Sequence, residues 1–142
     1  MEERGKHFRN MDRARALMCY DGMNFQGMMP TDLDMVIEIG NSTLIVGELK
    51  YGNAEVPIGQ RLVIERICTN WAKEGRHALG IIAHHQEKGD VLVKDAKVTM
   101  YWDTERSKWV KPERDYTVKS IIDAYILKFP AKSTFKGKGG AK

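Results

Sequence analysis

Apolar residues recur along the chain with two different periods, which separate predicted helices from predicted strands. Spacings of three and four residues indicate amphipathic helices over 8–20, 60–73 and 117–129. Short runs rich in β-branched residues indicate strands over 35–39, 43–49 and 78–83, with one or two more over 91–102. We expect Trp109 to continue the sheet after a turn near Asp103. The segment 23–30 is predicted to be a loop.

The order of these elements predicts an α/β fold with a mixed central β-sheet. Gly40, Asn41 and Ser42 are turn residues between two strands, so the strands on either side should form an antiparallel hairpin. The strand–helix–strand unit over 44–83 predicts a right-handed crossover between parallel strands. The nearly unbroken apolar run at 78–83 is typical of a central strand covered on both faces. We therefore expect a hairpin plus a parallel crossover strand, flanked by helices.

The hairpin register brings charged residues together. A three-residue turn at 40–42 makes Asp34 face Glu48, and one step further Asp32 faces Lys50. Directly opposed side chains share one side of a sheet with Cβ atoms about 4.5–5.5 Å apart. Glu48 and Lys50 are two residues apart, so they also share that side. A two-residue turn would change these pairings.

Two carboxylates that face each other repel, and a divalent cation between them would remove that cost. Mg²⁺ takes oxygen ligands and commonly uses one or two carboxylates with water and phosphate. A cation held by Asp34 and Glu48, with the Leu49 carbonyl as a further ligand, can polarise a phosphodiester and acidify a bound water. Lys50 would orient or deprotonate that water, or stabilise charge on the phosphate, and these roles stay open. The alternative is a solvent-facing Glu–Lys pair at a strand end.

These residues resemble the motif of the PD-(D/E)XK nuclease superfamily, which has the restriction-endonuclease-like fold and includes Holliday junction resolvases. The matching stretch runs from Pro30 to Asp34 and from Leu44 to Lys50, and Gln60 follows on the next helix. The resemblance implies Asp34 and Glu48 as metal ligands, Lys50 as the catalytic lysine, and Gln60 as a support for the site. Asp32 competes for the first position. Some members carry an acid on the first helix, a role for which Glu2, Glu3 and Asp12 are the nearby acids.

The resemblance implies a deoxyribonuclease that uses Mg²⁺ or Mn²⁺ to hydrolyse DNA phosphodiester bonds, and we expect an endonuclease. One alternative keeps the same site in a resolvase of Holliday junctions or branched DNA. The other is a DNA-binding protein that has kept the fold and lost catalysis. A compact domain covers little DNA, so a homodimer is compatible with each of these functions.

Length and charge add a domain boundary and a compartment. A chain of 142 residues fits one domain, which we place at 1–129, followed by a basic flexible tail at 130–142. The last 15 residues carry five lysines and no acid, and removing them from the net charge of +4 leaves −1. Such a tail suits phosphate contact or simple solubility. The charged N-terminus and the lack of a long apolar run favour a cytoplasmic protein without membrane contact, acting in the host cytoplasm if phage-encoded.

Weaker signals complete the list. We expect Cys19 and Cys68 to be buried, reduced thiols. His84 is interpreted as a strand-end residue or a phosphate contact, and Tyr51 as a hairpin cap or a stacking partner for a base. Four cations lie along and just after the second predicted helix and either track a DNA backbone or form a solvated face: Arg61, Arg66, Lys73 and Arg76.

Overall fold

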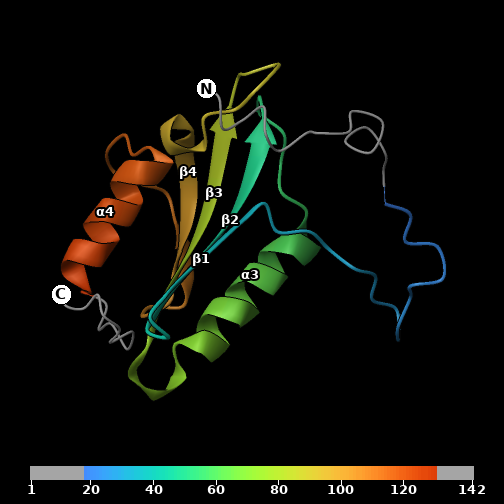
Figure 1. Cartoon of the computed structure of the whole chain (residues 1–142), viewed down its shortest axis with the longest axis horizontal. Coiled ribbons are helices and arrows are strands. Elements are labelled where there is room, and N and C mark those ends of the chain that lie inside the picture. Colours follow the sequence, from blue (N-terminus) through green and yellow to red (C-terminus); the bar gives the residue numbers. More distant parts are fainter. Residues whose placement is uncertain (1–17, 131–142) are drawn as a thin grey trace, which may run out of the picture. The chain divides into compact units, whose positions relative to one another are not determined.

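A computed structural model describes residues 18–130 of the chain. The chain divides into two compact units, residues 1–32 and residues 33–142. The second unit carries the sheet and both helices of the described part (Figure 1). The predicted boundary between a domain at 1–129 and a tail stays a prediction, because residues 131–142 lie outside the described range.

The second unit is an α/β fold built on a five-stranded mixed sheet, as the element order predicted. The strands lie in the order β1-β2-β3-β4-β5. The pair β2/β3 is parallel and the pairs β1/β2, β3/β4 and β4/β5 are antiparallel. Their bounds are Met35–Ile39 for β1, Thr43–Tyr51 for β2, His77–His85 for β3, Lys97–Asp103 for β4 and Lys108–Val110 for β5. The helices α3 (Ile58–Trp71) and α4 (Val118–Lys128) cover opposite faces of the sheet (Figure 1).

Alternation along the central strands divides the core into two layers. Along β2, Leu44 and Val46 pack toward α3, where they meet Ile64 and Cys68. Ile45 points the other way and packs with residues of β3, β4 and α4. Because successive strand residues point to opposite faces, both layers are built from one apolar run. The central strand predicted at 78–83 is confirmed as β3, with buried residues on both faces.

Close approach of α3 to the sheet depends on Gly80 in β3. A Cβ atom added at Gly80 would lie 2.5 Å from Cγ2 of Ile64 and 3.1 Å from Cβ of Trp102. Real Cβ atoms do not approach other atoms so closely. Glycine at this position therefore lets the side chain of Ile64, which is fully buried, occupy the surface of the strand.

Both helices of the second unit begin where local chemistry allows. Pro57 precedes α3, since proline fits a helix start but not its interior. Thr117 caps α4: its side chain accepts a hydrogen bond from the Ser120 amide, and the Ser120 hydroxyl oxygen accepts one from the Thr117 amide. The helices predicted at 60–73 and 117–129 are thus confirmed with shifts of one or two residues at their ends.

The other predicted elements differ from the structure in detail. Residues 93–95 form a short 3₁₀ turn and β4 begins only at Lys97, so the first part of the predicted strand at 91–102 is wrong. Residues 18–20 are not helical, although the periodicity extended a helix through them. The remainder of that predicted helix lies outside the described residues.

The described part of the first unit is a loop, which confirms the loop predicted at 23–30. Phe25 and Met28 form an antiparallel bridge around a tight turn, in which the Asn24 side chain accepts a hydrogen bond from the Gly27 amide at 2.9 Å. Cys19 is exposed, so the prediction that both thiols are buried is wrong for this residue. Residues 21–32 are exposed as well, so they form no core around Cys19. Cys68 lies on the face of α3 that packs on the sheet and is buried there, and both thiols are free.

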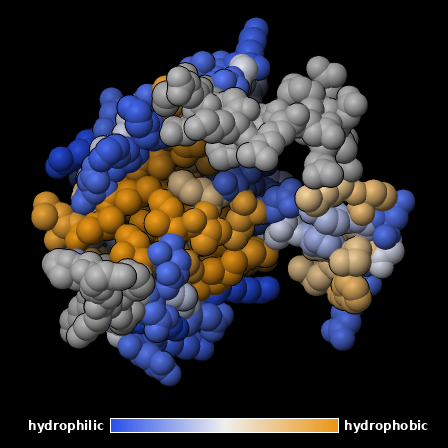
Figure 2. All heavy atoms as spheres, in the orientation of Figure 1, coloured by the Kyte–Doolittle hydropathy of each residue, from blue (hydrophilic) through white to orange (hydrophobic). Residues whose placement is uncertain are grey.

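Strand β1 forms one edge of the sheet, and apolar side chains gather around it. Figure 2 shows a broad apolar area on the face that Figure 1 presents, between the two helices. A groove of about 300 Å³ beside β1 is lined largely by apolar residues, among them Met35, Ile37 and Ile122, with charged residues such as Lys94 beside them. None of the described helices is long and apolar enough to span a bilayer.

Candidate active site

The hairpin register is the one that a three-residue turn predicted. Ile39 pairs with Thr43 and Met35 pairs with Gly47. Asp34 directly precedes β1, so one further step in the same register sets it opposite Glu48. Hydrogen bonds confirm that the two residues meet. The Asp34 amide donates to Oε1 of Glu48 at 3.3 Å, and the Leu49 amide donates to Oδ2 of Asp34 at 2.8 Å.

Glu48 is a buried acid with a raised pKa. The residue is 3% exposed, and it follows the apolar positions Leu44 and Val46 on the α3 side of β2. Its pKa is raised from 4.5 to about 7. Burial is the largest cause, and the negative charge of Asp34 is the second. The Asp34 amide and the positive charge of Lys50 act in the opposite direction. Glu48 is therefore held near the point where a proton and a metal ion compete for it.

Lys50 lies on the same side of β2 as Glu48, two residues further along the strand. It is half-buried and pairs in the ladder with His84 of β3. Its ammonium group is close enough to lower the pKa of Glu48. Among the described residues the side chain of Lys50 has no ion-pair or hydrogen-bond partner. The structure thus brings Asp34, Glu48 and Lys50 together at the start of β1 and the end of β2.

The Leu49 carbonyl faces the same space as the Asp34 side chain. The Leu49 amide points from β2 toward Asp34, just beyond the first residue of β1. The amide and carbonyl of one strand residue point in the same direction, so the Leu49 carbonyl also points to this side. Two carboxylates and one carbonyl make an all-oxygen donor set, which fits Mg²⁺ or Mn²⁺. Within residues 18–130 no three or more His, Cys, Asp or Glu side chains lie close enough together to hold a metal ion by themselves.

Gln60 lies in the first turn of α3, the helix that follows β2. Its side-chain oxygen Oε1 is buried and accepts no hydrogen bond from any described residue. No hydrogen bond joins the Gln60 side chain to Asp34 or Glu48. A buried acceptor without a partner is costly unless water or a ligand satisfies it, so the predicted supporting role stays a prediction with this observation in its favour.

The competing acid Asp32 belongs to the first unit, where its carboxylate accepts a hydrogen bond from the Tyr20 hydroxyl at 3.3 Å. Asp34 is the residue that meets Glu48. Glu2, Glu3 and Asp12 lie outside the described residues.

His84 holds neighbouring segments together. Its Nε2 lies 2.7 Å from the Ala54 carbonyl oxygen, and its Nδ1 lies 2.9 Å from the Thr99 hydroxyl. A carbonyl oxygen only accepts, so Nε2 carries a proton. Both ring nitrogens are engaged, which favours the strand-end structural role over contact with phosphate. Tyr51 is 48% exposed and meets the His85 ring edge-on.

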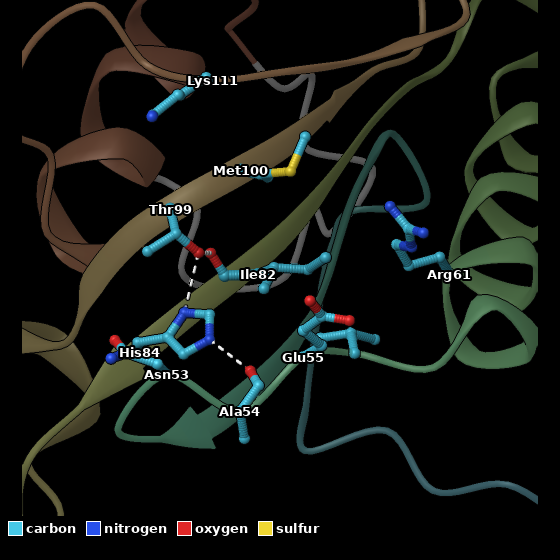
Figure 3. Close-up of a pocket in the computed structure, with 10 residues that line it drawn as sticks. Asn53, Ala54, Glu55, Arg61, Ile82, His84, Thr99, Met100 and Lys111 are labelled. Carbon is cyan, nitrogen blue, oxygen red and sulfur yellow. Dashed lines mark hydrogen bonds between the residues drawn. The ribbon is translucent and has the colours of Figure 1, made fainter.

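The cations around α3 separate into two kinds. Arg76 lies beyond the C-terminal end of the helix, stacks on Trp71 at 4.2 Å, and donates to the Trp71 carbonyl and to Asn41. It is used structurally. Arg61 lies at the other end, close to the start of the helix, and lines a cavity of about 440 Å³ (Figure 3). No acidic residue stands in the first turn of α3 and no side chain caps it, so the positive end of the helix dipole is not offset there.

The cavity includes residues that the sequence did not mark as functional. Ile82, Met100 and Lys111 line it together with the loop after β2 (Figure 3). Ile82 pairs directly with Glu48 in the ladder, and Met100 pairs with Ile82. The cavity therefore lies beside the acid pair on the α3 side of the sheet. The register of β3, β4 and β5 would be needed to predict that these residues line up with Glu48. Pairings between strands so far apart in the sequence cannot be read from a short segment.

Comparisons of the chain with protein-family models, with curated proteins and with solved structures find no match.

Proposed function

We propose that this chain is a metal-dependent deoxyribonuclease that hydrolyses DNA phosphodiester bonds, as a PD-(D/E)XK-type endonuclease. The observation that carries the proposal is the meeting of Asp34 with buried Glu48. An exposed acid set against a buried one costs folding free energy, because the two negative charges repel and the charge of Glu48 is desolvated. A divalent cation bound between them offsets that cost. The restriction-endonuclease-like fold is part of the same proposal.

The protein would hold the cation through Asp34, Glu48 and the Leu49 carbonyl. A Mg²⁺ or Mn²⁺ ion bound there supplies Lewis acidity toward a phosphate oxygen and acidifies water. The Leu49 amide fixes the Asp34 carboxylate through its hydrogen bond, so this ligand is held in place before a cation arrives. Burial of Glu48 excludes water from one side of the pair and strengthens its attraction for a cation.

Lys50 supplies the positive charge that phosphodiester cleavage needs beside the carboxylates. Its ammonium group has no counterion among the described residues and shares the side of β2 that carries Glu48. We assign to it contact with the phosphate undergoing attack, where negative charge accumulates. The carboxylate oxygens of the site repel phosphate, so Lys50 also lowers the cost of bringing DNA to it.

A cleavage assay tests the proposal. The protein is incubated with linear duplex, single-stranded and four-way-junction DNA in Mg²⁺, in Mn²⁺ and in EDTA, alongside Glu48→Gln. Glu87→Gln is the matched control, since Glu87 is an exposed acid in the loop after β3. We expect cleavage that EDTA stops, that Glu48→Gln abolishes and that Glu87→Gln preserves. Equal cleavage by Glu48→Gln and by the unaltered chain, or metal binding without cleavage of any DNA, would contradict the proposal.

A further inference from the structure

The ladder aligns the acid pair with the cavity of Figure 3 in one row across the sheet. Glu48 pairs with Ile82, and Ile82 pairs with Met100. Tyr101 pairs with Val110, so the next step of the same register sets Met100 opposite Lys111, just past the end of β5. Neighbouring strands are about 4.8 Å apart, which gives about 14 Å from Glu48 to Lys111 along the row. That length corresponds to a few nucleotides of a DNA strand.

The cavity combines an apolar floor with a charged rim. Val56, Ile82 and Met100 supply the floor, and the first two are buried. The rim carries Arg61 from α3 and Lys111 after β5, which enter the view of Figure 3 from opposite sides. With a volume of about 440 Å³, the space lies in the range of sites for small organic groups.

Both cations of the rim lack a counterion. The side chains of Arg61 and Lys111 form no ion pair and no hydrogen bond within residues 18–130. Glu55 also lines the cavity and is likewise unpaired among those residues, so an acceptor is present together with the two cations. An apolar floor, two cations and one acceptor match the three parts of a nucleotide: the face of a base, its phosphates, and the amino groups on the base edge.

We propose that this cavity binds one unpaired nucleotide of the DNA strand whose phosphodiester lies at Asp34 and Glu48. The base lies against Ile82 and Met100, and Arg61 and Lys111 contact the phosphates on either side of it. The inference rests on the proposed nuclease function and adds the class of substrate to it. A base that is still paired within a duplex cannot enter a cavity of this kind. The substrate is therefore DNA with a single-stranded segment, such as an overhang, a branch or an extruded nucleotide.

The position of the cavity gives the bound strand a direction across the sheet. The bound DNA strand runs from the start of β1, over β2 and β3, toward the end of β5. His84 supports the near wall, because it fixes the Ala54 carbonyl and the Thr99 hydroxyl, and both of these residues line the cavity (Figure 3). The cavity is thus formed before any ligand arrives, which lowers the entropic cost of binding.

Binding without cleavage tests this inference. The full chain is titrated in EDTA with a short fluorescein-labelled single strand, and anisotropy is measured at several salt concentrations. Lys111→Ala and Arg61→Ala are compared with Lys94→Ala, an exposed lysine near α4 on the opposite side of the sheet. We expect each cavity variant to weaken binding about tenfold, and to reduce the slope of log K against log salt by about 0.7. Lys94→Ala should differ from the unaltered chain by less than twofold.

Two further probes test the base and the unpaired state. The same strand with abasic residues keeps its phosphates and should bind more weakly, and the strand annealed to its complement should also bind more weakly. Equal affinity for the normal and abasic strands, or equal effects of Lys111→Ala and Lys94→Ala, would overturn the inference. Circular dichroism of each variant confirms that it is folded. Cleavage plays no part in these titrations, so a chain that binds as described and never cuts would refute only the proposed nuclease function.

Discussion

The Asp34 amide donates a hydrogen bond to the Glu48 carboxylate, while the Asp34 carboxylate accepts one from the residue after Glu48. The two acids are thus fixed to each other through the backbone, and neither can turn away without breaking a hydrogen bond. This arrangement holds two negative groups together in a place where one of them is almost fully buried. Protonation of Glu48 or binding of a cation would each lower the cost of that arrangement.

Stability should fall as pH rises from about 4.5 to about 7. The pKa of Glu48 is raised from 4.5 to about 7 in the folded chain, chiefly by burial. Between these pH values the native state binds more protons than the unfolded state, so the free energy of unfolding decreases with pH. Glu48→Gln stays neutral throughout. Its free energy of unfolding relative to that of the unaltered chain should therefore increase by up to about 3 kcal/mol between pH 5 and pH 8. Urea denaturation at both pH values measures this gain, and a gain equal to that of Glu87→Gln would refute the predicted cause.

Added Mg²⁺ or Mn²⁺ should raise the melting temperature, and more at pH 8 than at pH 6. At pH 6 the Glu48 carboxyl, with its pKa of about 7, is mostly protonated and competes with the metal. A cation at about a hundredfold excess over its dissociation constant stabilises the folded state by about 2.7 kcal/mol. Glu48→Gln and Asp34→Asn should lose this effect. Thermal denaturation followed by circular dichroism measures it, and stabilisation of equal size in both variants would place the cation elsewhere.

Lys50→Met should separate catalysis from metal binding. Removal of the ammonium group takes away the charge assigned to the phosphate, so the cleavage rate should fall about 100-fold or more. The stabilisation by Mg²⁺ should remain, because both carboxylates are intact. Lys88→Met removes the same charge from an exposed loop and should leave the rate unchanged. Cleavage is measured by gel under single-turnover conditions, and loss of metal-induced stabilisation in Lys50→Met would show that the lysine supports the ligands instead.

Gly80→Ala should destabilise the chain by about 1–3 kcal/mol. The added methyl group would lie 2.5 Å from Cγ2 of Ile64, whose side chain is fully buried. Gly89→Ala is the matched control, since nothing lies within 4 Å of a Cβ added at Gly89. Urea denaturation compares the two variants. A cost at Gly80 no larger than at Gly89 would show that α3 moves away from β3 without loss.

The hairpin and its acids were predictable because their geometry is local. Turn length fixes the register, and alternation then decides which residues share a side, so Asp34 and Glu48 followed from 15 consecutive positions. The burial of Glu48 was not predictable, because it depends on which distant elements cover that side of the sheet.

The cavity required pairings that no short segment contains. The register of β3 and β4 shifts at a bulge between Ile82 and Ala83, and β5 has only three residues, too few for a period to be recognised. Lys111 therefore looked like any other surface lysine in the sequence. The charge of Arg61 is evident from the sequence, but only the structure distinguishes Arg61, which lines the cavity, from Arg76, which stacks on Trp71.

The turn at residues 40–42 has a consequence for how this protein can change over evolutionary time. The length of this turn fixes the register of β1 and β2, and the register sets Asp34 opposite Glu48. One residue more or less would move Asp34 out of step with Glu48 while leaving both codons untouched. An insertion in this turn would therefore separate the two acids although neither is substituted. The loop at residues 52–57 can vary in length without altering their pairing.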